Sequence, residues 1–311
     1  MQLLRILTGQ TASGKGNVAV SLARRERAEI VSVDSMKVYR RLDIGTAKPS
    51  LRVREEVAFH LIDVVEPRET FTLVRFIEAA RKASADIERR GKVPLHVGGT
   101  PLYLRGLVYG VFDGPDADWA LREALLERAR RKGSVTLHKE LRRVDPVAAE
   151  RLHPNDIKRV VRALEVAELT GKPISEQQTQ FPVARPPTAY RMVALRRGEE
   201  DLRQRIDGRI DRMMKAGLAD EVRRVLQKGA LSRTAEKAIG YREIGRHLKG
   251  ELSLAEAVEE IRRHTWRFAR KQMTWLRSFP KVCWVDVAPD EPAEETAGRV
   301  RDIFFGPHTL N

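Results

Sequence analysis

Length, composition and charge restrict the class of protein to which this chain can belong. Its 311 residues are 42% hydrophobic, which is enough for a sizeable buried core and lies near the upper limit for one domain. No apolar run reaches the ~18 residues that a membrane span needs, and the chain starts MQLLRIL without a signal-peptide layout. We therefore expect a cytoplasmic protein that does not contact a membrane.

The chain is strongly basic and carries a single cysteine. There are 58 Lys and Arg against 43 Asp and Glu, a net charge of +15. Such a field attracts polyanions, nucleic acid first among them, but a surface that is basic without a partner gives the same count. One cysteine excludes an internal disulfide and a Cys/His zinc array, and we expect Cys283 to be a small core residue. No metal site made from side chains is predicted.

Strand and helix patterns alternate over the first third of the chain. Strand patterns occur in LLRIL (3–7), EIVSVD (29–34), HLIDVV (60–65) and VPLHVGG (93–99). Amphipathic helix patterns begin near Asn17 and again at Thr72, the second ending near residue 90. This alternation predicts a parallel β-sheet covered by helices, the α/β class.

The pattern changes at Asp113, where charged helical stretches with Pro and Gly breaks replace the strands. No strand pattern returns until YRMVALR (190–196), which follows the proline-rich FPVARPP. Long helix patterns then lead to one more strand, KVCWVDV, and a terminal helix. We predict an α/β core in two parts, residues 1–112 and 186–311, with residues 113–185 inserted as a helical lobe.

The stretch LTGQTASGKG contains the spacing of a phosphate-binding loop, G-x-x-x-x-G-K-[ST], between a strand and a helix. In that context backbone N–H groups and a helix N-terminus bind a diphosphate, and the lysine ammonium contacts its oxygens. A strand-to-helix turn that binds nothing is the alternative. The predicted diphosphate-binding residues are Gly9, Thr11, Ala12, Ser13, Gly14, Lys15 and Gly16.

Gly16 occupies the position where this loop normally carries a magnesium-binding hydroxyl. A kinase relies on that ligand because the charge on the transferred phosphoryl group must be neutralised in place. Gly16 therefore argues against a kinase. An enzyme in which the diphosphate is only a leaving group relies more on Lys, Arg and backbone donors.

The segment VDSMKVYRRLDIGTAKP (33–49) resembles the signature of the tRNA dimethylallyltransferases, which modify the adenosine immediately 3′ of the anticodon. The resemblance covers roughly residues 4 to 287. Later blocks resemble that family in the same order: HLIDVVEP, VGGTPLYLRGL, HPNDIKRVVRALEVAELTGKPIS, RIDGRIDRMMKAGLADEV, AIGYRE and RFARKQMTWLR. It implies a P-loop NTPase-like α/β core with an inserted helical lobe.

The resemblance also implies the reaction, transfer of a dimethylallyl group from dimethylallyl diphosphate to the exocyclic amine of that adenosine. Mg²⁺ is the implied cofactor, and Gly16 leaves its binding mode open. The chain departs from the family pattern at four positions, namely Gln10, Gly16, Lys37 and Trp266. We expect a monomer whose partners are the tRNA anticodon stem-loop and dimethylallyl diphosphate.

Three residues are assigned to catalysis. Asp34 follows the second strand, close to the phosphate loop, and is placed to accept a proton from the weakly nucleophilic amine. A cap for the following turn is the alternative role of Asp34. By the resemblance, Thr100 hydrogen-bonds near the reacting amine and Arg209 stabilises the leaving diphosphate, although either pattern alone fits a turn or a solvated helix.

The predicted tRNA contacts include three basic stretches and the residues around Asp34. They are Asp34, Ser35, Met36, Lys37, Lys158, Arg159, Val160, Val161, Arg162, Lys237, Gly240, Tyr241, Arg242, Arg270, Lys271, Gln272 and Arg277. Lys and Arg neutralise phosphates, while Tyr241 or Trp275 stacks on bases or packs in the core. Two alternative functions stay open, a non-catalytic RNA-binding relative and a small-molecule P-loop kinase.

Overall fold

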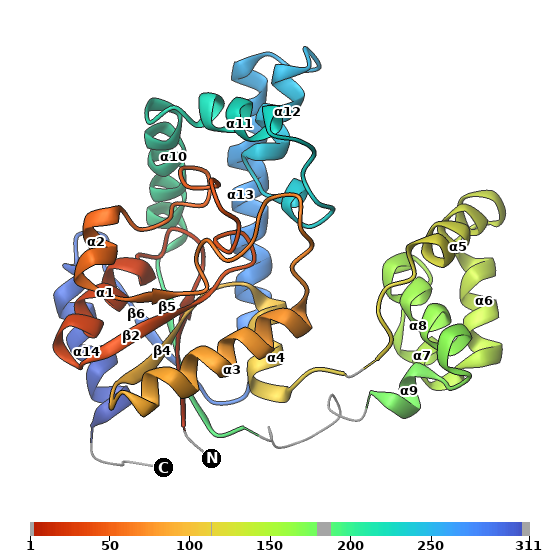
Figure 1. Cartoon of the computed structure of the whole chain (residues 1–311), viewed down its shortest axis with the longest axis horizontal. Helices are drawn as coiled ribbons and strands as arrows, with labels where there is room; N and C mark the ends of the chain where they lie inside the picture. The colour runs from red at the N-terminus through yellow and green to blue at the C-terminus, as the bar shows by residue number, and fades with distance from the viewer. Residues whose placement is uncertain (1–2, 113, 179–187, 307–311) are drawn as a thin grey trace. The chain divides into compact units, whose positions relative to one another are not determined.

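The computed structural model describes residues 3–112, 114–178 and 188–306 (Figure 1). The chain divides into two compact units. The α/β unit consists of Met1–Val108 and Thr188–Asn311, and the helical unit is Tyr109–Pro187. The segment FPVARPP lies outside the described residues.

The α/β unit is built on a six-stranded parallel sheet in the order β3-β2-β4-β1-β5-β6. Leu7 of β1 pairs with Val97 of β4 on one side and Val193 of β5 on the other. Because all strands are parallel, the loops after β1, β2 and β4 meet at one edge. The strands are β1 (Leu4–Gly9), β2 (Ala28–Val33), β3 (Phe59–His60), β4 (Val93–Gly98), β5 (Tyr190–Arg196) and β6 (Val282–Asp286).

Helices cover both faces of the sheet. Helices α1 (Lys15–Arg25) and α14 (Ala293–Phe305) bury Leu22 and Phe304 in one core with Leu7 of the sheet. Helix α3 (Leu73–Arg89) lies on the opposite face, where Ser84 contacts His96 and Phe76 stacks on Tyr103 of α4 (Pro101–Tyr109). Burial of these apolar side chains supplies the main stabilisation of the unit.

The remaining helices of the α/β unit surround the carboxyl edge of the sheet, where the loops after β1, β2 and β4 lie (Figure 1). They include the long helices α10 and α13, which contact each other. Ser253 caps α13 together with Glu256, in a reciprocal capping box that fixes where the helix begins. The helices are α2 (Leu51–Glu56), α10 (Glu199–Lys215), α11 (Leu218–Gln227), α12 (Tyr241–Leu248) and α13 (Leu254–Leu276), with a 3₁₀ turn at Ala235–Lys237.

The helical unit has its own apolar core and a buried charge cluster. The core includes Leu125, Leu137, Leu141 and Val160. Glu165 is fully buried and accepts hydrogen bonds from Arg122 at 2.8 Å and Arg162 at 2.6 Å, so its charge is paired. The helices are α5 (Trp119–Lys132), α6 (Ser134–Val144), α7 (Pro146–Arg151), α8 (Ile157–Thr170) and α9 (Ile174–Gln177).

The predicted P-loop NTPase-like fold class is confirmed, and two local predictions are wrong. The strand expected over 60–65 is limited to Phe59–His60, because Leu61 and Asp63 turn the backbone into the left-handed region with φ of 61° and 58°. Cys283 is exposed rather than buried. It lies near the start of the edge strand β6, and the buried cluster includes β6 only from Val285.

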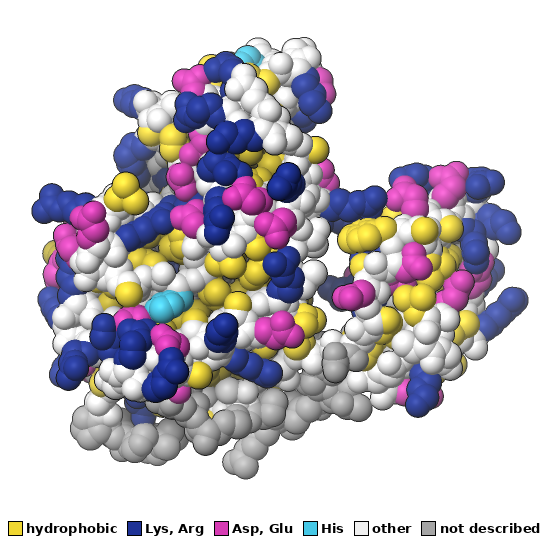
Figure 2. All heavy atoms as spheres, in the orientation of Figure 1, with side chains coloured by type: hydrophobic (Ala, Val, Ile, Leu, Met, Phe, Trp, Pro, Cys, Tyr) yellow, Lys and Arg dark blue, Asp and Glu magenta, His cyan; other side chains and the backbone are white. Residues whose placement is uncertain are grey.

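Lys and Arg side chains are spread over the visible surface of both units, with Asp and Glu among them (Figure 2). Many of these cations are paired, as Arg90 is with Asp86. Exposed ion pairs of this kind contribute little stability. Because the two charges largely cancel, such a pair attracts a charged ligand only weakly. The positions of unpaired cations therefore matter more than the net charge of +15.

Candidate active site

A cleft of about 810 Å³ lies at the carboxyl edge of the sheet and is called the central cleft. Its walls come from the loops after β1, β2 and β4 and from α10 and α13. Ser13 is buried beneath it. The sequence-predicted residues that line it are Thr11, Ala12, Gly14, Lys15, Gly16, Asp34, Ser35, Met36, Lys37, Thr100, Arg209, Lys237, Gly240 and Gln272.

The phosphate loop, residues 9–16, depends on glycines for its shape. Gly9 has φ of 144°, and a Cβ there would lie 2.8 Å from the carbonyl oxygen of Leu195 in the neighbouring strand. Gly14 has φ of 92° and directly precedes α1, so the helix N-terminus opens on the central cleft. The Lys15 ammonium donates to the Gln10 carbonyl at 3.0 Å.

The loop carries an excess of positive charge. Burial lowers the pKa of Lys15 to about 7, and the neighbouring cations Arg209 and Lys37 add to the effect. Burial also lowers the pKa of Arg209. Burial and mutual repulsion disfavour the charged forms of Lys15 and Arg209. An anion that binds between the two side chains stabilises those charged forms. The loop is thus suited to a phosphate or diphosphate ligand.

Three arginines hold successive residues of the loop from outside. The guanidinium groups donate from Arg197 to the Ser13 carbonyl at 2.9 Å and from Arg205 to the Ala12 carbonyl at 3.1 Å. Arg209 contacts the Thr11 hydroxyl at 3.3 Å. Arg197, which the sequence analysis missed, is almost fully buried, and its side chain also pairs with Asp201 at 2.9 Å. These contacts fix the loop before a ligand arrives, which reduces the reorganisation on binding.

Gln272 of α13 joins two loops of the sheet edge. Its side-chain oxygen accepts from the Thr11 backbone N–H at 2.7 Å, and its amide nitrogen donates to the Gly99 carbonyl at 2.7 Å. Gln10 reaches back to the same helix, donating to the Ala269 carbonyl at 3.1 Å. The Gln272 side chain is buried and engaged at both ends, so it positions the site; it also lines the central cleft, and its contact with tRNA stays a prediction.

Asp34 and Thr100 face each other across the ends of β2 and β4. One oxygen of Asp34 accepts from the backbone N–H groups of Met36 at 2.8 Å and Lys37 at 3.2 Å, so the alternative role as a turn cap is present. The carboxylate nevertheless lines the central cleft, and its other oxygen has no hydrogen bond within the described chain. The Thr100 hydroxyl accepts from the Ser35 N–H at 3.1 Å. Both catalytic assignments stay predictions.

The loop 42–48 reaches the central cleft through Gly45 to Ala47 and is held by buried charges. The Glu221 carboxylate accepts from the backbone N–H groups of Asp43, Ile44 and Gly45 and from the Tyr241 hydroxyl. A Cβ on Gly45 would lie 2.5 Å from the Tyr241 ring. Tyr241 is therefore a core residue, which is the second of the two roles that the sequence left open for it.

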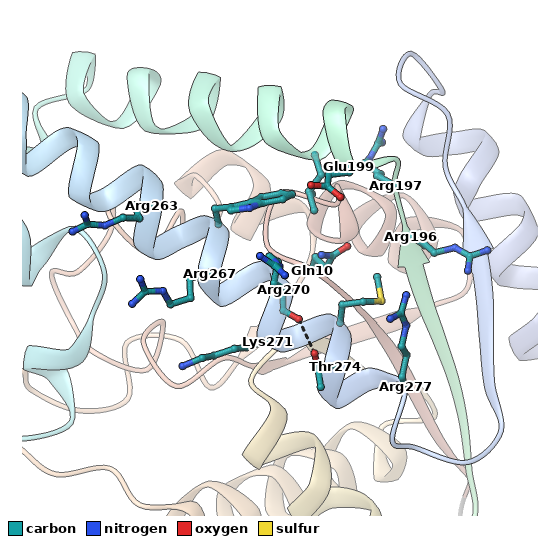
Figure 3. A pocket seen from close by; sticks show the side chains of 13 residues that line it. Gln10, Arg196, Arg197, Glu199, Arg263, Arg267, Arg270, Lys271, Thr274 and Arg277 are labelled. Carbon is teal, nitrogen blue, oxygen red and sulfur yellow. Dashed lines mark hydrogen bonds between the residues drawn. The ribbon is translucent and has the colours of Figure 1, made fainter. Parts of the chain in front are cut away.

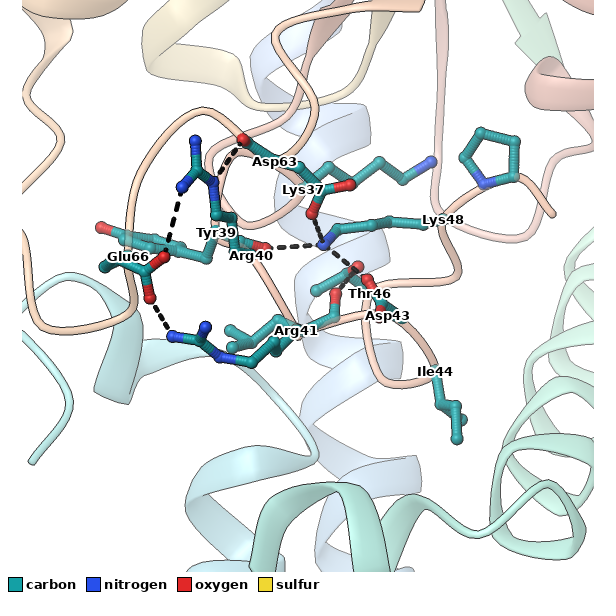
Figure 4. A network of polar contacts seen from close by, with 12 residues as sticks. Lys37, Tyr39, Arg40, Arg41, Asp43, Ile44, Thr46, Lys48, Asp63 and Glu66 are labelled. Atoms are coloured by element: carbon teal, nitrogen blue, oxygen red, sulfur yellow. Dashed lines mark hydrogen bonds and ion pairs between the residues drawn. The ribbon is translucent and has the colours of Figure 1, made fainter. Parts of the chain in front are cut away.

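Lys48 anchors the same loop from its other side (Figure 4). Its ammonium donates to the Tyr39 carbonyl at 2.6 Å, to Asp43 at 2.7 Å and to Asp63 at 2.5 Å. Its side chain is about 1% exposed, so these three oxygens replace the water that the ammonium loses on burial. Glu221 and Lys48 thus hold the segment IGTAKP from two sides and fix its shape.

A second cavity of about 750 Å³, called the basic groove, lies on the opposite face of α13 (Figure 3). Arg196 and Arg197 of its wall are paired with Asp286 and Asp201. The predicted contacts Arg270, Lys271 and Arg277 lie here together with Arg267, and no carboxylate of the described residues lies within 4 Å of these four side chains. Unpaired cations along one groove are the feature that binds a phosphate backbone.

The helical unit corrects the prediction for residues 158–162. Val160 and Val161 are buried in its core, so their side chains cannot contact RNA. Lys158 and Arg159 are exposed, and Arg162 is used internally on Glu165 and the Pro115 carbonyl. In the α/β unit, Arg242 likewise pairs with Glu243 and contacts His264 at 2.9 Å. Arg159 also pairs with Asp156 at 3.2 Å, and tRNA contacts by Lys158 and Arg159 stay predictions.

Comparisons with known proteins bear on this arrangement of sites. The model of the IPP transferase family matches residues 37–279, and that of isopentenyl transferases matches 2–58. A tRNA dimethylallyltransferase of Geobacter metallireducens is 47% identical over 284 residues, 91% of this chain and 92% of the relative. The chain belongs to the IPP transferase family. The family assignment made from the motifs is confirmed.

Solved structures of related transferases have the same fold. The tRNA isopentenylpyrophosphate transferase of Bacillus halodurans is 34% identical, covers 98% of this chain and 96% of its own, and has a TM-score of 0.73. A eukaryotic dimethylallyltransferase acting on tRNA is 25% identical, with a TM-score of 0.82 over 100% of this chain and 82% of its own. Within the described residues, no helix of this family member combines the length and apolar character of a membrane span.

The hydroxyl that usually binds magnesium in a phosphate loop is missing from this IPP transferase. Gly16 offers no oxygen, and a Cβ at that position would meet no atom within 4 Å. Asp201, the other carboxylate of the central cleft, is paired with Arg197. No group of three His, Cys, Asp or Glu suited to a metal occurs in the part of the chain that the structure describes.

Proposed function

We propose that this enzyme transfers the dimethylallyl group of dimethylallyl diphosphate to the exocyclic amine of the adenosine 3′ of the anticodon in tRNA. The observation that carries the proposal is the meeting of two halves of a reaction site in the central cleft. Lys15 and Arg209 lie at the phosphate loop, and Asp34 and Thr100 lie at the ends of the next two strands. Membership of the IPP transferase family supports the same assignment.

The phosphate-loop half of the cleft serves the leaving group. As the bond between the allylic carbon and the diphosphate oxygen breaks, the electron pair stays with the diphosphate and its negative charge rises. The Lys15 ammonium is held by the Gln10 carbonyl and the Arg209 guanidinium by the Thr11 hydroxyl, while Gln272 and Arg205 fix the loop that carries the remaining backbone N–H donors. Preorganised donors of this kind stabilise the transition state without reorganising during the reaction.

The other half of the cleft serves the acceptor. The adenine amine is a poor nucleophile because its lone pair is delocalised into the ring. As its nitrogen forms the new bond to carbon, it must lose a proton, and the free oxygen of Asp34 accepts it. A positioned base of this kind contributes about 10²- to 10⁴-fold to the rate. Thr100, fixed by the Ser35 N–H, is placed to orient the amine.

Recognition of the tRNA anticodon stem-loop uses the unpaired cations of the basic groove. Arg270, Lys271 and Arg277 there bind backbone phosphates, with Lys158 and Arg159 of the helical unit as further contacts. The adenine inside the loop must leave its stack to reach Asp34, at a cost of a few kcal/mol that the phosphate contacts offset. We propose that the enzyme acts as a cytoplasmic monomer.

The decisive experiment is mass spectrometry of tRNA nucleosides. Purified enzyme is incubated with dimethylallyl diphosphate and tRNA that lacks the modification, and the digest is searched for an adenosine heavier by one dimethylallyl group. The expected result is that nucleoside, located next to the anticodon and lost in Asp34→Asn. A folded wild-type enzyme that binds tRNA without forming the product would instead favour the non-catalytic RNA-binding relative.

A further inference from the structure

Lys37 is a cation of the central cleft to which the structure gives no internal partner. Its side chain lines the cleft together with Lys15 and Arg209. Its backbone N–H is fixed by Asp34 at 3.2 Å, so the start of the side chain is anchored. Within the described residues, no hydrogen bond involves the Lys37 ammonium and no carboxylate lies within 4 Å of it.

Lys48, on the same segment, shows what a structural lysine looks like in this protein. Three oxygens surround its ammonium, and Figure 4 shows the three contacts converging on it. No contact reaches the end of the Lys37 side chain in the same view. Lys37 is half-buried, and because the protein supplies no hydrogen-bond acceptor for its ammonium, a ligand in the cleft can supply one.

The surroundings of Lys37 identify the chemistry of that ligand. Burial has the largest effect on the pKa of Lys37 and lowers it; Asp34 raises this pKa and Arg209 lowers it, and Lys37 in turn lowers the pKa of Lys15. Asp34 is the one carboxylate of the cleft wall that opposes these cations, since Asp201 is paired with Arg197. An anion with several negative charges, bound between Lys15 and Arg209, is the ligand that relieves this repulsion.

The same cleft lacks the charge that phosphate loops usually gain from a metal. The hydroxyl that holds magnesium in such loops is replaced by Gly16, and the position beside Gly16 is open. We propose that Lys37 is a further diphosphate-binding residue, and that its ammonium supplies positive charge which a magnesium ion held by the loop would otherwise supply. The diphosphate is the leaving group of the proposed function, on which this inference rests.

Isothermal titration with inorganic pyrophosphate tests the inference without any group transfer. Wild type, Lys37→Gln and the matched control Lys82→Gln are each titrated in EDTA and in excess magnesium. Lys82 is an exposed residue of α3, so its variant removes one positive charge outside the cleft. The expected result is that wild type and Lys82→Gln bind pyrophosphate in EDTA, whereas Lys37→Gln binds about ten-fold or more weakly.

A charge-preserving variant and a folding measurement complete the experiment. Lys37→Arg should bind pyrophosphate in EDTA within about three-fold of wild type, because it keeps the charge at that position. Thermal unfolding of each variant shows whether a loss of binding reflects a loss of fold. Equal affinities for Lys37→Gln and Lys82→Gln, or a wild type that binds pyrophosphate only with magnesium, would overturn the inference.

The two proposals fail in different ways. Pyrophosphate binding that depends on Lys37, in an enzyme that forms no modified adenosine, would contradict the proposed function and leave the role of Lys37 intact. A modified adenosine formed at equal rates by wild type and Lys37→Gln, with equal pyrophosphate affinities, would contradict the role of Lys37 alone.

Discussion

The Gln272 side chain accepts a hydrogen bond from the backbone N–H of Thr11 at 2.7 Å, so a residue of α13 fixes the phosphate loop. We expect Gln272→Leu to weaken pyrophosphate binding about ten-fold, because the Thr11 N–H and the Gly99 carbonyl both lose a buried partner. Isothermal titration measures this effect. The neighbouring variant Lys271→Gln is the control, since Lys271 faces the basic groove.

The two variants should show opposite patterns. Lys271→Gln should weaken tRNA binding and leave pyrophosphate binding within about two-fold of wild type, because it removes one phosphate contact on the other face of the helix. A weaker tRNA complex for Gln272→Leu with unchanged pyrophosphate affinity would support the direct tRNA contact that the sequence predicted.

Asp34→Asn separates the two roles of this residue. The asparagine oxygen can still accept from the Met36 N–H, so the turn is kept, but the side chain no longer accepts a proton. Single-turnover rates should fall by about 10² or more, with tRNA affinity within a few-fold of wild type. Asp34→Ala, which also removes the cap, should in addition lower the stability by about 1 kcal/mol. A single-turnover rate for Asp34→Asn close to that of wild type would rule out the base.

Salt dependence tests the basic groove. Neutralising Arg270 and Lys271 together should reduce the slope of log K against log salt by about one to two units, since each phosphate contact contributes about 0.7 for single strands. Arg196→Gln serves as the control, because Arg196 is already paired with Asp286 in two hydrogen bonds. Identical slopes for the double variant and wild type would show that this face of α13 does not meet the tRNA.

The pKa of Lys15, lowered to about 7, predicts a pH dependence of diphosphate binding. A bound diphosphate favours the charged ammonium and raises its pKa, so affinity is greatest below pH 7 and falls as the pH rises above it. Pyrophosphate itself titrates, and Lys15→Arg corrects for this because its guanidinium stays charged. Wild type should lose affinity between pH 7 and 9 more steeply than Lys15→Arg. Parallel curves would show that Lys15 is fully charged in the free enzyme.

Periodicity and spacing were sufficient to place most strands and the phosphate loop, because both patterns depend on residues near in sequence. The apolar spacing of Val160, Val161 and Leu164 also marks the buried face of α8, and it should have excluded the two valines from the RNA contacts. The two valines were predicted to contact RNA only because they lie inside a basic stretch that resembles a tRNA-contacting segment of the family. Strand length at 60–65 was missed because Leu61 and Asp63 adopt positive φ, which residues of these types seldom do.

The residues that hold the loops of the site in place could not be predicted from the sequence. Arg197 contacts Ser13 across 184 positions of the chain, and Gln272 contacts Thr11 across 261. Glu221 likewise reaches the loop 42–48 from α11. Such contacts depend on how α10, α11 and α13 pack around the sheet edge. The secondary-structure propensity of a single segment does not indicate this packing.

Gly16 gives the last prediction, which concerns the magnesium requirement. The open position beside Gly16 accommodates a threonine, and threonine is a better helix former than glycine in the first turn of α1. Gly16→Thr offers a hydroxyl ligand to magnesium carried by the diphosphate. The magnesium concentration for half-maximal rate should therefore fall by about three- to thirty-fold, equivalent to roughly 0.7 to 2 kcal/mol.

The measurement is a magnesium titration of the transfer rate, with each curve normalised to its own plateau. A lower midpoint for Gly16→Thr means that the wild-type loop binds a diphosphate without an inner ligand for the metal, and that Lys15, Arg209 and the N-terminus of α1 balance its charge. Superimposable curves would mean that any metal is held elsewhere. A wild type inactive at every magnesium concentration, beside an active Gly16→Thr, would contradict the proposed function and identify a chain that has lost catalysis through this one position.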